Sequence, residues 1–163
     1  MSVRVALAVL VVLAAGTAST RASSARTVPC GEMIGTVRFP YAGYRTVLGT
    51  VSVPRPYLAR VVATRDRPWA YWRKAGLVVR AGRVPVTVSV APAWRDRAAI
   101  TWGNNTGVVA SLRIAGCPGA RTVGLAYAGG FYIRSRSACV PLTFRVGRRS
   151  ATVRFGVGRR CVS

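Results

Sequence analysis

The chain has 163 residues, of which 25 are Lys or Arg, 3 are Asp or Glu and none is His, so its formal net charge is +22. The absence of His excludes Ser–His and Cys–His catalytic pairs and histidine-ligated metals, and the three carboxylates (Glu32, Asp66 and Asp96) are too few for an acidic metal cage or a glycosidase pair. A hydrophobic fraction of 51% argues against disorder, and the length suits a single domain.

The N-terminal segment has the residue order of an export signal. Arg4 is followed by an uncharged apolar run at residues 5–16 and then by small residues. This run of 12 residues is shorter than the roughly 20 that a membrane-spanning helix needs, which argues against the alternative of an uncleaved anchor. The sequence therefore predicts a signal peptide at residues 1–25.

Two alanines are candidate cleavage sites. Small residues precede both Ala18 and Ala25; cleavage after Ala25 is favoured, with Ala18 as the alternative. Cleavage after Ala25 removes two arginines and leaves a secreted domain at residues 26–163. That domain has 23 basic and 3 acidic residues, a net charge of +20.

Beyond residue 25, Gly, Pro and polar clusters divide the chain into short pieces of high β-propensity. Val86, Val88 and Val90 alternate with Thr87 and Ser89, which is the period-two pattern of a half-buried strand. Strands are expected at residues 33–39, 44–53, 77–81, 85–90, 98–102, 108–115, 123–128, 140–146 and 151–157. Turns are expected at 40–43, 81–84, 103–107, 118–120 and 147–150, and a short helical turn near 92–97. This pattern predicts one all-β, antiparallel, sandwich-like domain of about 8–10 strands.

Aromatic and basic side chains are interleaved at residues 65–74 (RDRPWAYWRK). Trp69, Tyr71 and Trp72 belong to the residue types that stack on sugar rings or nucleobases, while neighbouring arginines contact phosphate. The alternative is that these rings cover the core below a long loop. The segment is therefore a candidate ligand-stacking site.

Two adjacent glycines, Gly129 and Gly130, interrupt an aromatic stretch. Glycine inside a strand is typical of a bulge, or of a site where another backbone approaches closely. We expect a bend in the sheet at this point.

Two segments of the chain resemble each other. Residues 77–91 and 142–156 align without gaps and are identical at six of fifteen positions. Each is expected to form a hairpin whose turn opens with Gly-Arg, and in the second hairpin the turn is centred after Arg148. Alternatively, the similarity reflects only the Val-rich pattern that many β-strands share.

The register of these hairpins places Arg145 opposite Thr152 and Arg80 opposite Thr87, which avoids direct repulsion between arginines. The second hairpin and the residues after it form the densest basic stretch of the chain. Its candidate anion-binding residues are Arg145, Arg148, Arg149, Arg154, Arg159 and Arg160. Guanidinium groups on a solvent-facing surface hold phosphate or carboxylate bidentately. The alternative is a solvated edge strand whose charge only prevents aggregation.

The chain contains four cysteines and no C-x-x-C spacing. An even number of cysteines in an exported protein predicts two disulfides, and the missing spacing and missing His argue against zinc. Sequence alone leaves all three pairings open. The cysteines are Cys30, Cys117, Cys139 and Cys161.

Three segments of the chain carry a resemblance to known proteins: TWGNNTG, YAGGFYIRSRSACVPLTFRVG and VRFGVGRRC. In these segments the chain resembles small exported β-rich proteins of GC-rich actinobacteria, and the resemblance spans most of the residues after the predicted signal. It implies export and a β-rich domain held by cystines. It implies no activity and supplies no functional residue.

Arg outnumbers Lys by 24 to 1, as GC-rich codon usage favours, but codon usage does not account for the scarcity of acidic residues. A protein with so high a positive charge repels itself, which indicates an anionic environment. We therefore expect a non-enzymatic, extracellular protein, retained electrostatically on anionic envelope polymers or lipid headgroups, without metal or cofactor. The alternative is an extracellular module that binds carbohydrate or nucleic acid through residues 65–74.

Overall fold

Two neighbouring strands of the structure follow the alternation of the sequence closely. In β9 (Val86–Val90) and β14 (Ala138–Val146) every second side chain is buried, and those between them are half-buried or exposed. The buried set is almost entirely apolar, because burial removes hydrocarbon surface from water. Each of these strands therefore has one side on the core and one side toward solvent.

The computed structural model describes residues 25–162. The predicted signal peptide at residues 1–25 and its candidate cleavage sites thus lie outside the described residues, except for Ala25 itself. The first strand begins at Arg26, directly after that alanine. Within the described range, no helix is long and apolar enough to cross a membrane.

The predicted all-β fold is confirmed. The described residues form fifteen strands, more than the expected number of about 8–10, because one predicted strand is divided in two and five further strands were not predicted from the sequence. The strands are β1 (Arg26–Val28), β2 (Gly35–Arg38), β3 (Arg45–Val47), β4 (Val51–Val53), β5 (Tyr57–Leu58), β6 (Val62–Ala63), β7 (Tyr71–Lys74), β8 (Leu77–Arg80), β9 (Val86–Val90), β10 (Ala98–Trp102), β11 (Ser111–Ile114), β12 (Val123–Tyr127), β13 (Gly129–Ile133), β14 (Ala138–Val146) and β15 (Arg149–Val157). Two 3₁₀ turns are present at Cys30–Glu32 and Pro92–Trp94, the second within the predicted helical turn.

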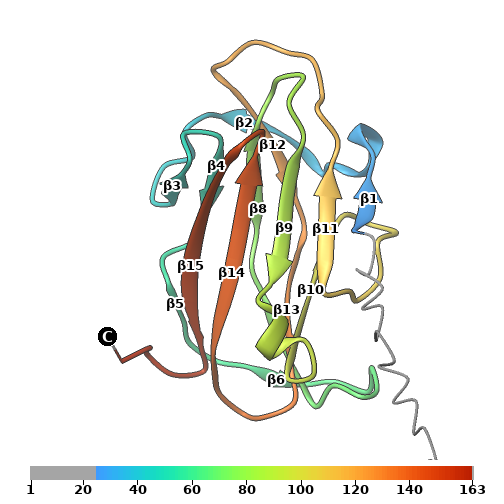
Figure 1. Cartoon of the computed structure of the whole chain (residues 1–163), viewed down its shortest axis with the longest axis vertical. Coiled ribbons are helices and arrows are strands. Elements are labelled where there is room, and N and C mark those ends of the chain that lie inside the picture. Colours follow the sequence, from blue (N-terminus) through green and yellow to red (C-terminus); the bar gives the residue numbers. More distant parts are fainter. Residues whose placement is uncertain (1–24, 163) are drawn as a thin grey trace, which may run out of the picture.

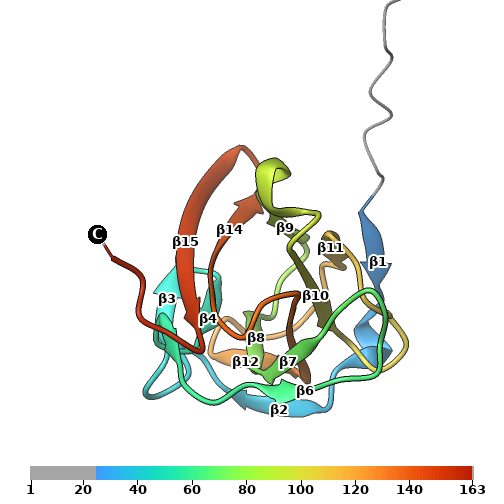
Figure 2. The ribbon, with the colours of Figure 1, turned by 90° about the horizontal axis from the view of Figure 1, so that it is seen from below.

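Three sheets form two layers (Figure 1 and Figure 2). The first sheet has the strand order β1-β11-β9-β14-β15-β5 and makes one layer alone. The second sheet (β2-β12-β8-β4-β3) and the third sheet (β10-β13-β7-β6) together make the opposite layer. Neighbouring strands are antiparallel, except that β1 is parallel to β11 and β5 is parallel to β15. The arrangement is the sandwich-like one that the sequence predicts.

Aromatic side chains from both layers meet in the core. Phe131 on β13 lies between Trp102 on β10 and Phe155 on β15, with ring centroids 5.8 and 5.2 Å apart respectively. All three side chains are at most 2% exposed. Because the contact between Phe131 and Phe155 joins the third sheet to the first, the core is continuous across the two layers.

The glycine pair lies where the chain leaves one sheet and enters another. β12 belongs to the second sheet and β13 to the third, and Ala128 alone separates them. A Cβ on Gly129 would lie 1.8 Å from the carbonyl oxygen of Thr101, and a Cβ on Gly130 would lie 2.0 Å from that of Arg73. The prediction of a close backbone approach is confirmed, since the neighbouring strands β10 and β7 leave no room for a side chain.

The prediction that residues 77–91 form a hairpin is wrong. β8 pairs with β4 and β12 in the second sheet, whereas β9 pairs with β11 and β14 in the first. Arg80 therefore lies opposite Gly124 and not opposite Thr87. The connection between β8 and β9 crosses from one layer to the other, which strand–turn–strand patterning alone does not distinguish from a hairpin. The similarity to residues 142–156 is thus not a repeated unit of structure.

The second predicted hairpin forms, but its register differs by two residues. β14 and β15 are joined by a two-residue turn that starts at Gly147, whose φ is 58°. Glycine adopts this conformation without steric cost, and such a turn matches the twist of the flanking strands. Arg145 consequently lies opposite Ser150 and not opposite Thr152. A hydroxyl side chain still faces this arginine, and a shift of two leaves the same side chains toward the core.

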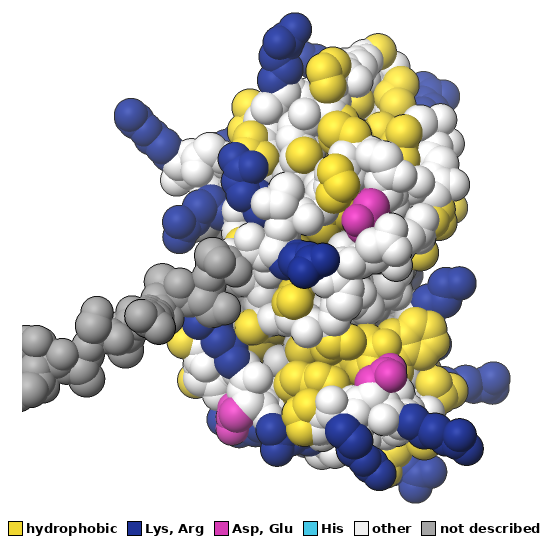
Figure 3. All heavy atoms as spheres, turned by 90° about the vertical axis from the view of Figure 1, so that its right-hand side faces the viewer, with side chains coloured by type: hydrophobic (Ala, Val, Ile, Leu, Met, Phe, Trp, Pro, Cys, Tyr) yellow, Lys and Arg dark blue, Asp and Glu magenta, His cyan; other side chains and the backbone are white. Residues whose placement is uncertain are grey.

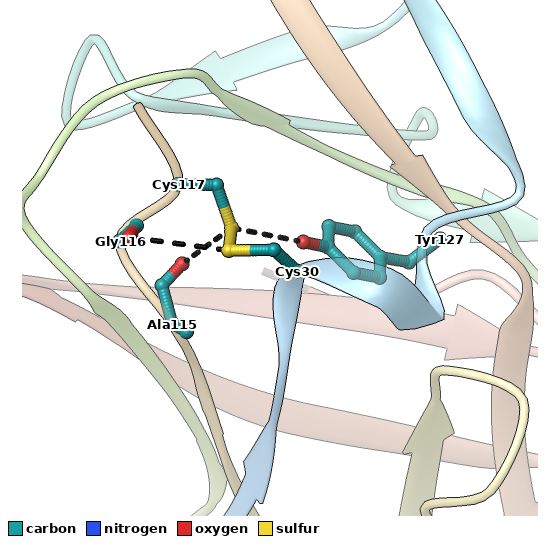
Figure 4. The surroundings of a disulfide bond; sticks show 5 residues. All are labelled: Cys30, Ala115, Gly116, Cys117 and Tyr127. Carbon is teal, nitrogen blue, oxygen red and sulfur yellow. Dashed lines mark hydrogen bonds between the residues drawn. A yellow bond between two sulfur atoms is a disulfide. The ribbon is translucent and has the colours of Figure 1, made fainter. Parts of the chain in front are cut away.

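Two disulfides are present, as predicted, and the structure gives their pairing. Cys30 is bonded to Cys117 and Cys139 to Cys161, with Cα atoms 5.7 and 5.4 Å apart. Figure 4 shows the first bond beside the Tyr127 hydroxyl, which donates a weak hydrogen bond of 3.9 Å to the Cys117 sulfur. Burial raises the pKa of this hydroxyl, so it keeps the proton that it donates. Two disulfides are typical of proteins of oxidising compartments.

Candidate anion-binding site

The six predicted anion-binding arginines do not form one surface. Arg145 and Arg154 are exposed between buried neighbours, on the solvent-facing side of the first sheet. Arg149 lies directly opposite the buried Val146 and so shares the core-facing side of the hairpin. It reaches the other layer, where its Nη2 donates a hydrogen bond of 3.1 Å to the carbonyl of Leu48.

The remaining three arginines lie at opposite ends of β15. Arg148 is in the turn before this strand, and Arg159 and Arg160 come after it. A strand of nine residues spans about 26 Å, which is the separation of the two groups along the hairpin. A single small anion cannot contact both ends, so the basic stretch divides into separate places.

The solvent-facing side of the first sheet, which we call the outer face, alternates arginine with hydroxyl side chains. One row across β11, β9, β14 and β15 consists of Arg113, Thr87, Arg145 and Ser150. The next row consists of Ser111, Ser89, Thr143 and Thr152. Because no arginine in these rows is directly opposite another, the guanidinium groups stand roughly two strand spacings, about 10 Å, apart. A hollow of about 280 Å³ lies on this face beside Arg145.

Arg149 lines a cavity of about 300 Å³ at one end of the sandwich, together with Arg80, Arg83 and Arg121. We call it the four-arginine cavity. Arg149 lies on β15 and Arg80 on β8, whereas Arg83 lies in the β8–β9 connection and Arg121 in the β11–β12 connection. These segments meet beside the β14–β15 turn (Figure 1). Sequence reasoning missed three of the four, because only the fold brings them together. The Gly-Arg pair at residues 82–83 is the one local signal for an arginine in this connection, but its pattern predicts a hairpin turn and not a cavity wall.

The three carboxylates are held elsewhere. Glu32 accepts a hydrogen bond of 3.2 Å from the backbone N–H of Asn105, and Asp66 accepts one of 2.8 Å from the hydroxyl two residues before it. Asp96 contacts Arg97 at 3.6 Å, in the only ion pair among residues 25–162. None of these carboxylates lines the four-arginine cavity. Figure 3 shows the acidic side chains isolated from one another and basic side chains around the whole outline of the molecule.

The three predicted stacking residues do not share a face. Tyr71 and Trp72 are neighbours on β7, so they point to opposite sides of the third sheet. Tyr71 packs against the core, whereas Trp72 lies beside Tyr132, with ring centroids 6.4 Å apart. Trp69 precedes the strand, and the guanidinium of Arg134 lies 5.8 Å from its ring centroid. Strand alternation therefore prevents the three rings from forming one stacking platform.

A hollow of about 210 Å³ lies beside Trp72 and Tyr132 and is also lined by Asp66. The indole N–H of Trp72 is buried and has no hydrogen-bond partner among the described residues. Burial, followed by the neighbouring Asp66 carboxylate, raises the pKa of the Tyr132 hydroxyl, which stays protonated at neutral pH. Aromatic rings, two donors and a carboxylate acceptor are groups suited to a hydroxyl-rich ligand.

No family model matches the chain, and no curated protein shows a significant match to it. In the part of the chain that the structure describes, no three His, Cys, Asp or Glu side chains are grouped so that they could hold a metal ion. What the protein does must therefore be inferred from its fold and its charged surface.

Proposed function

We propose that the protein is secreted and associates electrostatically with the anionic cell envelope, without catalysing a reaction. The observation that carries this proposal is unpaired positive charge. Beyond residue 25 the chain has 23 basic side chains, and the single ion pair within residues 25–162 leaves all but one of them without a carboxylate. In the face that Figure 3 shows, these side chains lie along much of the outline of the molecule and do not gather in one patch.

Charge balance is the physical basis of the proposal. A domain with a net charge of +20 repels itself, and contact with a polyanion relieves this repulsion. Teichoic-type polymers, acidic polysaccharides and anionic lipid headgroups all supply negative charge, and binding to them releases small counterions into solution. The predicted signal peptide and the two disulfides support an extracellular location.

The outer face suits a flexible polymer better than a single small ligand. Its arginines are spread among hydroxyl side chains, so a chain of spaced negative charges meets a cation in many registers. The hydroxyls add neutral hydrogen bonds without increasing the repulsion between arginines. Such a surface favours retention on a polymer without selection of one sequence of repeats.

Binding of residues 26–163 to a glycerol-phosphate polymer is expected to weaken steeply with salt. If about four phosphates are neutralised, the affinity falls about 50-fold between about 50 and 200 mM salt, because each contact releases a counterion. Fluorescence anisotropy of the labelled polymer over a salt series measures this fall. Dextran, which is neutral, is the control polymer and should not bind at any salt concentration.

Charge variants give the matched comparison for this measurement. The double variant Arg145→Ser/Arg154→Ser, which changes two exposed arginines, should reduce the salt slope by about 1.4 units, at about 0.7 per phosphate contact. Trp72→Ala, which changes no charge, should leave the slope as it is. Polymer binding that does not respond to salt, or binding to dextran of equal strength, would contradict electrostatic retention.

Carbohydrate binding is a second candidate function, and one observation favours it. The hollow beside Trp72 combines a partly exposed ring with an unpartnered indole N–H, a protonated phenol and the Asp66 carboxylate. A sugar ring stacks on an aromatic face and hydrogen-bonds through its hydroxyls to such groups. This site would use one of the three aromatics that the sequence suggested, Trp72, together with Tyr132.

Under this second candidate, Trp72→Ala is expected to weaken binding of a neutral oligosaccharide about tenfold, since stacking on one aromatic ring contributes about 1–3 kcal/mol. Saturation-transfer NMR with a panel of neutral oligosaccharides measures the effect. Trp94→Ala is the matched control, because Trp94 lies in a 3₁₀ turn outside this hollow. The carbohydrate function is rejected when no panel member binds the unaltered protein, or when both variants lose the same affinity.

A further inference from the structure

The four-arginine cavity combines a concave shape with unopposed positive charge. Its lining includes Thr50, two glycines and short aliphatic side chains in addition to the four arginines, and it contains no carboxylate and no aromatic ring. Its volume of about 300 Å³ lies at the lower end of the range of small-molecule sites. The cavity therefore has room for a small anionic group with part of a polymer chain attached.

Close backbone contacts fix the walls of the cavity. The backbone N–H of Gly82 donates a hydrogen bond of 2.8 Å to the carbonyl of Cys117, which is bonded to Cys30. A Cβ at Gly116 would lie 2.1 Å from the Arg83 carbonyl oxygen, so the β8–β9 connection is packed directly on the segment before Cys117. The disulfide thus holds the two connections that supply Arg83 and Arg121.

Contacts within the protein restrict the side chains of two of the four arginines. Arg149 donates one hydrogen bond to the carbonyl of Leu48 through Nη2, and its other N–H groups have no partner among the described residues. Arg80 is half-buried, and its guanidinium carbon lies 6.0 Å from the ring centroid of Phe39. Preorganised guanidinium groups lose little conformational entropy when an anion binds.

The other two arginines, Arg83 and Arg121, are exposed. Neither contacts a carboxylate in the described part of the chain, where Arg97 makes the one ion pair. Four positive charges around one cavity repel one another. An anion bound among them offsets this repulsion and accepts charge-assisted hydrogen bonds from the guanidinium groups. The mutual repulsion of the four arginines therefore favours an anionic occupant.

The geometry points to the nature of this occupant: we propose that the four-arginine cavity binds a phosphate group of a polyol-phosphate polymer. The arginines come from separate segments around the cavity, which suits a tetrahedral anion with oxygens on several sides more than a planar carboxylate. The lining offers no aromatic ring for a nucleobase to stack on, which disfavours a nucleic acid. This inference rests on the proposed function, because it names the group of the envelope polymer that is recognised.

Titration calorimetry with glycerol 3-phosphate at about 150 mM salt, where distant charges are screened, tests the cavity directly. The protein should show saturable binding, and Arg83→Gln/Arg121→Gln should weaken it about tenfold or more. Both replaced side chains are exposed, so the variant should melt at the same temperature as the unaltered protein. Arg113→Gln/Arg154→Gln, which removes the same charge from the outer face, should change the affinity less than about twofold.

Lysine variants separate guanidinium geometry from charge. Arg83→Lys/Arg121→Lys keeps the net charge but loses bidentate hydrogen bonding, so it should also weaken glycerol 3-phosphate binding, by about threefold or more. Full affinity in the lysine variant, or equal losses in the cavity and outer-face glutamine variants, would overturn a built phosphate site. The same conclusion follows if glycerol 3-phosphate does not bind in a saturable manner.

Competition experiments identify which kind of polymer supplies the phosphate group. A glycerol-phosphate polymer should displace glycerol 3-phosphate at a lower phosphate concentration than a single-stranded oligonucleotide does, and the reverse order would overturn the polyol assignment. The two proposals also fail separately. If the Arg83→Gln/Arg121→Gln variant keeps its salt-dependent polymer binding and its affinity for glycerol 3-phosphate, electrostatic retention stands and the phosphate site is rejected. If the protein binds glycerol 3-phosphate in a saturable manner but does not bind the polymer, the cavity is a phosphate site and electrostatic retention is rejected.

Discussion

Replacing Cys30 and Cys117 with alanine is expected to lower the free energy of unfolding by about 4–5 kcal/mol, and replacing Cys139 and Cys161 by about 3 kcal/mol. The difference follows from loop length, because the paired cysteines are 87 residues apart in the first bond and 22 in the second. A crosslink that closes a longer loop removes more conformational freedom from the unfolded chain. Denaturant titration of each double variant, followed by circular dichroism, measures both losses.

The first disulfide also lies behind the four-arginine cavity, so its removal should have a second effect. Cys117 accepts the backbone hydrogen bond of Gly82 and holds the β8–β9 connection in place. Under conditions in which both double variants remain folded, glycerol 3-phosphate binding should weaken without the Cys30–Cys117 bond and persist without the Cys139–Cys161 bond. In the denaturant titration, equal losses of unfolding free energy in the two double variants would contradict the dependence on loop length.

Strands whose apolar residues are clearly bounded could be predicted accurately from the sequence. The expected strand at residues 98–102 coincides with β10, and the one at 85–90 contains β9. In both places apolar residues are bounded by Pro, Gly or polar residues, and the burial that results is a local property of the strand. The sequence pattern therefore carried the same information as the structure.

Short and interrupted strands could not be predicted. The expected strand at residues 44–53 is divided into β3 and β4 by a turn in which Leu48 and Gly49 have φ values of 52° and 64°. Leucine rarely adopts a positive φ, so its identity gave no sign of a turn. β5 and β6 have two residues each, which is too short for an alternation to be recognised. Only pairing with a neighbouring strand makes such segments part of a sheet.

The candidate site depended on tertiary structure even more than the fold did. The basic residues of the second hairpin were identified, but the direction of Arg149 follows from a register that is set by a turn at Gly147. Arg80 and Arg121 come to the same cavity because β8 pairs with β12 in the second sheet, and Arg149 reaches it from β15 in the opposite layer. Composition predicted that anions would be attracted, and the crossing between layers determined where four arginines converge.

The layer opposite the first sheet is itself made of two sheets, and Trp102 lies at the junction between them. The chain passes between these sheets twice, from β7 to β8 and from β12 to β13. Trp102 contacts both passages: its indole N–H donates a hydrogen bond of 2.8 Å to the carbonyl of Ala75, and a Cβ at Gly129 would lie 2.7 Å from its Cδ1. Its ring also lies edge-on to Phe131 in the core.

Trp102→Ala is therefore expected to lower the free energy of unfolding by about 4 kcal/mol, as a large buried aromatic side chain is lost and a cavity remains. Trp102→Phe keeps an apolar ring but leaves the Ala75 carbonyl without its donor in a site that is 2% exposed, so we expect a loss of about 2 kcal/mol. Denaturant titration followed by far-ultraviolet circular dichroism measures both values without relying on tryptophan fluorescence. A loss below about 1 kcal/mol for Trp102→Ala would mean that this side chain does not join the two passages, since surface substitutions have effects of that size.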